Sequence, residues 1–82
     1  MTQYEKILRY MLVNPKTGVT IRDGLRLNIN WLHKRIRELE QMGIEIRRVD
    51  ENNEGVRFRR YFLMNPKQAA DMVATFEKKR GA

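Results

Sequence analysis

Residues Leu27 to Ile46, LNINWLHKRIRELEQMGIEI, carry the strongest secondary-structure signals of this 82-residue chain. Asn28 is a favoured N-cap residue, and four apolar side chains follow it at the spacing of one helix face: Ile29, Leu32, Ile36 and Leu39. Glycine is the residue type most often found just past the end of a helix, and Gly43 has this position here. The pattern therefore predicts a helix over residues 28–42.

Beyond Gly43 the hydrophobic period changes from helical to alternating. Ile44 and Ile46 begin a strand pattern, and the residues from 56 to 63 are rich in aromatic side chains and arginine. Between them, residues 50–55 form the polar run DENNEG, which is typical of a turn. We expect a β-hairpin over residues 44–63 with this run as its turn.

Two helices are predicted before the central stretch. Five side chains line one stripe of a helix over residues 2–14, in which Thr2 is a possible N-cap and Pro15 sets the end: Tyr4, Ile7, Leu8, Met11 and Leu12. A shorter helix is predicted over residues 17–27. Ile21 and Leu25 would anchor it, Thr17 or Thr20 would cap it, and Gly24 weakens it.

A last helix is predicted over residues 65–80. Asn65 and Pro66 suit its first positions, and basic side chains suit its end: Lys78, Lys79 and Arg80. Its apolar stripe is Ala69, Met72, Val73 and Phe76. The chain is therefore expected to be one α+β domain spanning residues 1–82, with three helices, a hairpin and a C-terminal helix. This is the element order of a small winged helix-turn-helix.

Composition argues against several classes of function. The chain has no Cys and one His, so neither a disulfide nor a metal site is expected. No nucleophile with a paired base and no glycine-rich phosphate loop can be assembled, so we expect no enzyme, no cofactor and no small-molecule ligand. The first fifteen residues are amphipathic and interrupted by charge, which predicts neither a signal peptide nor a membrane span. A cytoplasmic, nucleoid-associated location is expected.

A net charge of +7 and a pI near 10.3 favour polyanionic partners, nucleic acid above all, with acidic proteins or anionic membranes as alternatives. On the predicted helix 28–42, the face away from the apolar stripe carries side chains able to read bases or bind phosphate. The base-reading candidates are Asn30, Trp31, Lys34, Arg37 and Gln41. An ordinary solvated helix face would carry similar residues, so this pattern alone is weak.

Arginines gather on the flanking elements as candidates for binding phosphate. They are Arg22, Arg26, Arg35, Arg47, Arg48, Arg57, Arg59 and Arg60. Three acids near the predicted turn, Asp50, Glu51 and Glu54, would repel a phosphate backbone or pair with neighbouring arginines. We therefore expect contacts from the flanks of the hairpin rather than from its tip.

The aromatic residues have two interpretations. A domain of this size needs most of its seven aromatic side chains for its core, so we expect core packing even for Trp31, with contact to nucleic acid as the alternative. Phe58, Tyr61 and Phe62 could also form a stacking surface for single strands. His33 is expected on the helix flank rather than as a ligand.

Over residues 27–46 the chain resembles the winged helix-turn-helix domains of bacterial and phage regulators, including the N-terminal domain of the biotin repressor. The shared pattern is a small capping residue, the apolar and basic helix HKRIRELEQMGI, and a strand. Residues 61–63 resemble the end of that family's wing, so the resemblance covers residues 4–64. Arg22 and Arg26 depart from the family, which usually has a small residue and a Gly in this region.

Together these features predict a double-stranded DNA-binding protein, a transcriptional regulator or architectural factor of phage or mobile-element type. The helix 28–42 would enter the major groove and the arginine-rich wing would bind phosphates. The alternative is a protein-protein interaction or dimerisation module that binds an acidic partner or a second copy through the C-terminal helix. Exposure of Met72, Val73 and Phe76 would favour that alternative.

Overall fold

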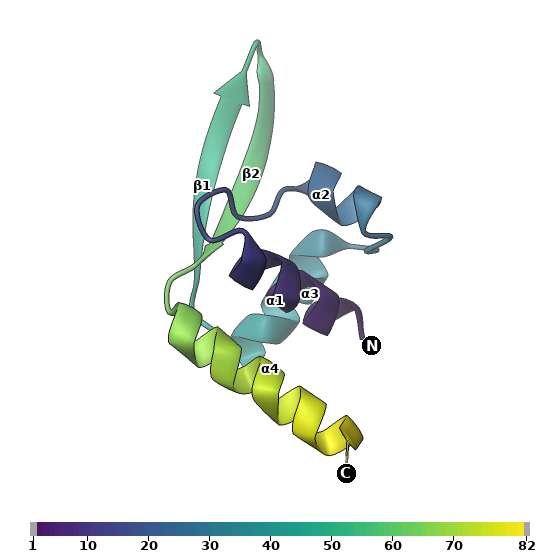
Figure 1. Ribbon diagram of the computed structural model, residues 1–82. Helices are drawn as coiled ribbons and strands as arrows, with labels where there is room; N and C mark the ends of the chain where they lie inside the picture. The colour runs from purple at the N-terminus through teal and green to yellow at the C-terminus, as the bar shows by residue number, and fades with distance from the viewer. Residues whose placement is uncertain (1, 82) are drawn as a thin grey trace.

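The computed structural model describes residues 2–81 and contains four helices and one hairpin in the predicted order. The elements are α1 (Gln3–Val13), α2 (Ile21–Arg26), α3 (Leu32–Gln41), β1 (Ile46–Asn53), β2 (Val56–Leu63) and α4 (Pro66–Gly81). The first three helices form the body, the hairpin projects from it, and α4 lies along the opposite side (Figure 1). This order confirms the α+β class.

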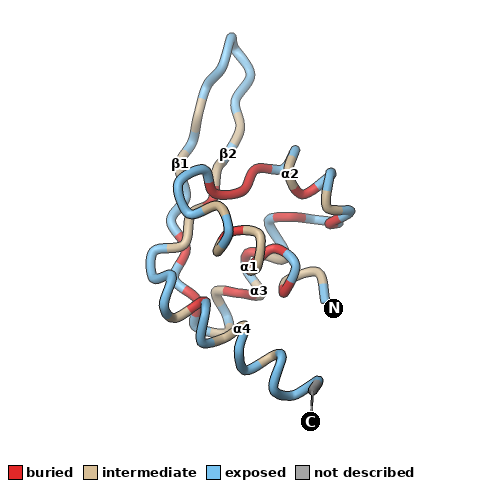
Figure 2. Tube along the Cα trace, in the orientation of Figure 1, coloured by how far each residue is buried: buried red, intermediate tan, exposed pale blue. Residues whose placement is uncertain are grey.

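The core lies where α1, α3 and the base of the hairpin meet (Figure 2). It is built from side chains of every element except α2, together with the connecting segments: Ile7, Leu8, Met11, Val19, Ile29, Leu32, Ile36, Leu39, Ile44, Ile46, Tyr61 and Ala69. The predicted apolar stripe from Ile29 to Leu39 is buried throughout. Burying these side chains supplies the main driving force for the fold.

Helix α1 begins and ends close to the predicted positions. The Thr2 hydroxyl accepts a hydrogen bond from the Glu5 backbone N–H at 3.3 Å, as an N-cap should. The helix ends at Val13, and Asn14 lies in a non-helical conformation before Pro15, which disfavours helix in the preceding residue.

Helix α2 is shorter than predicted, and it buries a different face from the predicted one. Thr20, rather than Thr17, caps it in a reciprocal capping box with Asp23. The predicted anchors were wrong, because Ile21 is 63% exposed and Leu25 is 69% exposed. The buried residue is Gly24, which lies against Ile29 and Leu32. A Cβ at Gly24 would lie 3.6–3.8 Å from these two side chains, so the position also has room for a methyl group.

Helix α3 begins four residues later than predicted, and the expected N-cap was wrong. Asn28 has a φ of 57° and Trp31 has a φ of 56°, so both lie in the left-handed region, and Trp31 holds the N-cap position without a side-chain hydrogen bond. The loop of residues 27–31 places Ile29 in the core, where its N–H donates to the Gly24 carbonyl at 2.8 Å. Core burial therefore outweighs the capping preference of Asn28.

The predicted end of α3 is confirmed. Gly43 follows with a φ of 98°, a conformation that glycine accepts readily. The Ile44 N–H donates to the Leu39 carbonyl and the Gly43 N–H to the Glu40 carbonyl. These two bonds form a Schellman motif, which terminates the helix and directs the chain into β1.

The hairpin of β1 and β2, here called the wing, has a tighter turn than predicted. The six-residue turn was wrong, because Asp50 to Asn53 continue β1 and only Glu54 and Gly55 connect the strands. Both have positive φ, 52° and 83°, as a type I′ turn requires. At the base of the wing, Val19 adds one antiparallel bridge to Tyr61, so the segment before α2 is attached to β2.

Helix α4 begins where predicted and packs against α1. The Asn65 side chain accepts from the Gln68 N–H at 3.2 Å, and Pro66 is the first helical residue. The rings of Tyr4 and Phe76 lie 5.7 Å apart, and Met72 and Val73 also pack against the core. The apolar stripe of α4 is therefore covered within the chain.

A charge network centred on the buried Glu5 also joins α1 to α4. Glu5, only 3% exposed, accepts hydrogen bonds from Arg9 at 3.0 Å and from Arg80 at 2.6 Å, while Arg9 also binds Glu77. Burial opposes ionisation of Glu5, but the hydrogen bonds from Arg80 and Arg9 outweigh it and hold its pKa below the ordinary value.

Candidate nucleic-acid interface

The outer face of α3 carries most of the predicted base-reading residues. Lys34, Arg37 and Gln41 are exposed and lie three and four residues apart, on one side of the helix. With His33 and Glu38 they line one shallow hollow. His33 is exposed on the helix, as predicted, and adjoins the candidate site.

Two predicted base-reading residues precede α3 in the chain. Asn30 is exposed in the loop, and its backbone N–H donates to the Gln3 side chain at 3.1 Å. Trp31 is 71% exposed at the N-cap position. The expectation that Trp31 packs in the core was wrong, because the loop directs Ile29 inward in its place.

Three of the predicted phosphate-binding arginines of the wing are paired with carboxylates of α3 or of the wing itself. Arg48 binds both carboxylate oxygens of Glu40 and lies 5.7 Å from the centre of the Tyr61 ring. Its hydrogen bonds lower the pKa of Glu40, and the carboxylate in turn raises the pKa of Arg48. Arg59 binds Asp50 at 2.8 Å, which raises the pKa of Arg59.

Arg60 joins the wing to the segment before α2. It contacts Glu51 at 3.0 Å, donates to the Thr17 carbonyl at 2.8 Å and lies over the Phe58 ring. The predicted alternative that acids near the turn pair with arginines is thus confirmed for Asp50 and Glu51. These contacts position the wing and leave less of this charge available to a ligand.

The strand register places the wing arginines on two opposite faces. Directly paired residues share a face of a sheet, and Arg48, Arg57 and Arg59 lie on the face whose base contacts Glu40 of α3. Arg47 lies on the other face, where it lines a hollow with Pro15 and Phe62. Arg57 is exposed and forms no ion pair among the described residues.

The remaining arginines differ in accessibility. Arg22 and Arg26 are exposed on α2, and Arg26 makes only a 4.0 Å contact to Asp23. Arg35 is partly buried and lies 2.9 Å from Glu38. Lys34 and Arg37 are therefore exposed on α3, and Arg57 is exposed on the face of the wing whose base contacts α3, whereas Arg35 is partly buried and Arg47 lies on the other face of the wing.

Most acidic side chains of the described chain are used in ion pairs with arginine: Glu5, Asp23, Glu38, Glu40, Asp50, Glu51 and Glu77. The excess positive charge therefore belongs to cations that have no such partner. Among these are Arg22 on α2, Lys34 and Arg37 on α3, and Arg57 on the wing. An electrostatic surface of this kind attracts phosphates.

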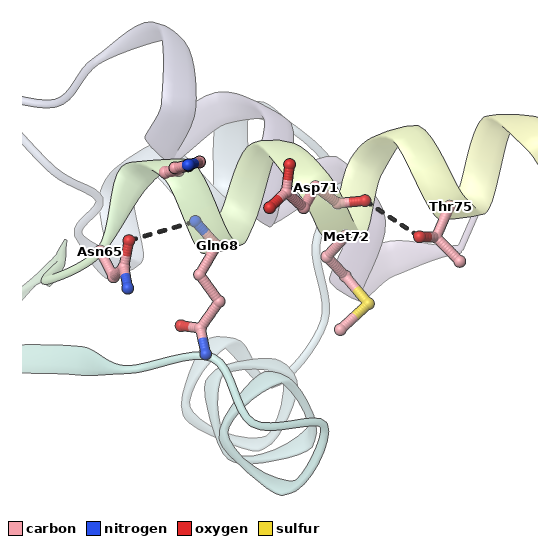
Figure 3. A pocket seen from close by; sticks show the side chains of 6 residues that line it. Asn65, Gln68, Asp71, Met72 and Thr75 are labelled. Carbon is pink, nitrogen blue, oxygen red and sulfur yellow. Dashed lines mark hydrogen bonds between the residues drawn. The ribbon is translucent and has the colours of Figure 1, made fainter.

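A hollow at the start of α4 lies apart from this surface. It is lined by Asn65, Lys67, Gln68, Asp71, Met72 and Thr75, and Figure 3 shows several of its polar groups engaged in hydrogen bonds of the helix itself. The Gln68 side chain accepts from the Glu45 N–H at 3.1 Å and donates to the Gly43 carbonyl. Gln68 therefore attaches α4 to the connection between α3 and β1.

Within residues 2–81, no three acidic or histidine side chains gather closely enough to hold a metal ion. Over the same residues, every helix is too short or too polar to cross a bilayer.

No protein-family model, curated protein or solved structure matches this chain.

Proposed function

We propose that this protein binds double-stranded DNA as a small winged helix-turn-helix, and that it acts as a transcriptional regulator or architectural factor of phage or mobile-element type. In this proposal α3 enters the major groove, where Lys34, Arg37 and Gln41 face base edges. Arg57 of the wing and Arg22 and Arg26 of α2 contact phosphates.

One observation carries this proposal. Lys34 and Arg37 on α3 and Arg57 on the α3-side face of the wing are exposed and form no ion pair among the described residues, whereas Arg48 and Arg59 on that face are paired with Glu40 and Asp50. A merely solvated surface would be expected to mix both signs. The bidentate bond between Arg48 and Glu40 also holds the wing beside α3, which suits a ligand that contacts both.

The alternative of a dimerisation module built on α4 has less support. Met72, Val73 and Phe76 are partly buried against the core, and Phe76 packs on Tyr4 of α1, so the apolar stripe that this alternative needs is not freely exposed. The exposed apolar pair Ile21 and Leu25 lies on α2 instead, next to Arg22 and Arg26.

The test is fluorescence-anisotropy titration of the protein with labelled duplex DNA at two salt concentrations. Contacts to several phosphates predict a log-log slope of about −4 or steeper. Reversing two charges on α3, in Lys34→Glu/Arg37→Glu, should weaken binding by roughly 100-fold or more, given several contacts of about 1–3 kcal/mol each.

The matched control is Lys78→Glu/Lys79→Glu, which makes the same change in net charge at the exposed end of α4. If both double variants lose affinity equally, binding depends on net charge alone and the α3 interface is wrong. If the wild-type protein fails to bind duplex DNA at low salt, the proposed function is wrong.

A further inference from the structure

Trp31 has two unfavourable features that no contact of its own side chain offsets. Its side chain is 71% exposed, and its φ of 56° is sterically disfavoured for a bulky residue. Its ring contacts the His33 ring edge-on, with centroids 6.4 Å apart, and its side chain makes no capping hydrogen bond. Strain held at an exposed residue is a common mark of a functional position.

The other aromatic residues do not share this exposure. Tyr4, Tyr10, Phe62 and Phe76 are partly buried against neighbouring elements, and Tyr61 is buried. Phe58 is partly buried beneath Arg60. Trp31 is therefore the one Trp, Tyr or Phe residue of the chain with an exposed ring, and all seven of these residues lie within the described part.

Trp31 lies at the end of α3 that would approach a ligand of this helix. It precedes the first helical residue, three residues before Lys34, and recognition helices contact base edges chiefly through their N-terminal residues. This step rests on the proposed function. In that arrangement the indole ring lies at the floor of the major groove rather than over phosphates.

The chemistry of the major groove then limits what an apolar ring can read. Base edges there present hydrogen-bond donors and acceptors, and the C5 methyl of thymine is the apolar group among them. Side chains that wedge between base pairs enter from the minor groove, and platforms for single strands use several exposed rings. We propose that Trp31 reads thymine through its C5 methyl, and so determines part of the sequence specificity.

The test compares two versions of one duplex. The duplex is first selected from a random pool by the wild-type protein, then synthesised with either thymine or uracil, which lacks the methyl. Loss of one buried methyl contact should weaken wild-type binding about fourfold in anisotropy titrations. Trp31→Gly should bind both versions equally, and Trp31→Phe should retain part of the preference.

Glycine is the informative replacement because it accepts a positive φ. Trp31→Gly should therefore keep the folded state, and its thermal unfolding midpoint measured by circular dichroism should match the wild-type value. Val13→Ala, at the exposed end of α1, is the control: it should keep both the affinity for duplex DNA and the preference for thymine over uracil.

Fluorescence supplies an independent measurement, since Trp31 is the sole tryptophan. Its emission should shift or quench when the thymine duplex is added. Binding without discrimination between thymine and uracil would overturn this inference and leave the proposed function standing. Absence of binding to either duplex would overturn both.

Discussion

Glu40 near the end of α3 and Arg48 on β1 form a two-pronged ion pair that joins the wing to the helix. The pair lies on the face of the wing that also carries Arg57. Its position fixes the angle between the two elements that the proposed interface requires. Because the two charges of this pair neutralise each other, they contribute little to that interface. Arg48 therefore has a structural role that requires no contact with DNA.

Removing one partner of this pair should loosen the wing. Glu40→Gln should lower the free energy of unfolding by about 0.5–1 kcal/mol, because both side chains are only partly buried. It should also weaken DNA binding, although it removes a negative charge. Denaturant unfolding and anisotropy titration measure the two effects.

Glu54→Gln is the matched control, since it removes an acid at the exposed turn of the wing. It should leave stability unchanged and bind DNA as well as or better than the wild type. If Glu40→Gln also binds more tightly, the carboxylate acts through repulsion rather than through position.

A side chain at Gly18 should disrupt the base of the wing. Gly18 has a φ of 64°, and a Cβ there would lie 2.2 Å from the Tyr61 carbonyl oxygen, beside the bridge between Val19 and Tyr61. Gly18→Ala should destabilise the fold by roughly 2–4 kcal/mol through backbone strain and loss of this bridge. Thermal unfolding is the measurement.

Gly24→Ala should have the opposite effect. A Cβ at Gly24 would meet Leu32 and Ile29 at 3.6–3.8 Å, which is ordinary contact. Alanine in place of a helical glycine stabilises by about 0.5–1 kcal/mol. A lower melting temperature for this variant would show that α2 packs more tightly on α3 than described.

Acid should weaken the contact between α1 and α4. The pKa of Glu5 lies below its ordinary value of 4.5 in the folded protein, so the folded state favours the ionised form. Its contribution to stability is therefore complete above about pH 4.5 and is lost as the pH falls through the lower, folded-state pKa. Glu40, whose pKa is also lowered, adds to this acid sensitivity.

Unfolding measured between pH 7 and pH 3 should show the effect. Glu5→Gln should flatten this pH dependence and lower stability at neutral pH, since Arg9 and Arg80 lose their shared partner. Glu45→Gln, which changes an exposed acid outside the ion pairs, is the control. Equal pH profiles for Glu5→Gln and the wild type would contradict the role of the network.

The exposure of Leu25 on α2, where burial was predicted, can be checked by replacing this residue. Leu25→Lys should change stability by less than about 0.5 kcal/mol, as expected of an exposed position. Leu32→Ala removes a buried side chain and should cost about 2–5 kcal/mol. A large loss in Leu25→Lys would place that side chain in the core, as the sequence pattern suggested.

Local chemistry by itself determined the order and type of the elements. Thr2, Pro15 and Gly43 act on the backbone next to them, and the apolar stripe of α3 depends only on helical geometry. The covered stripe of α4 follows the same periodicity. Each of these signals extends over one or two turns, which is why the sequence alone predicted them.

Tertiary structure decided which surfaces face inward and which charges remain available. Gly24 rather than Leu25 faces α3, because the buried face of α2 depends on how α2 packs against Ile29 and Leu32. Trp31 is exposed because the loop before α3 needs Ile29 in the core. Asp50 pairs with Arg59 because the two lie opposite each other in the strand register. Such competition for space and for partners involves residues distant in the chain, so it arises only once the elements pack together.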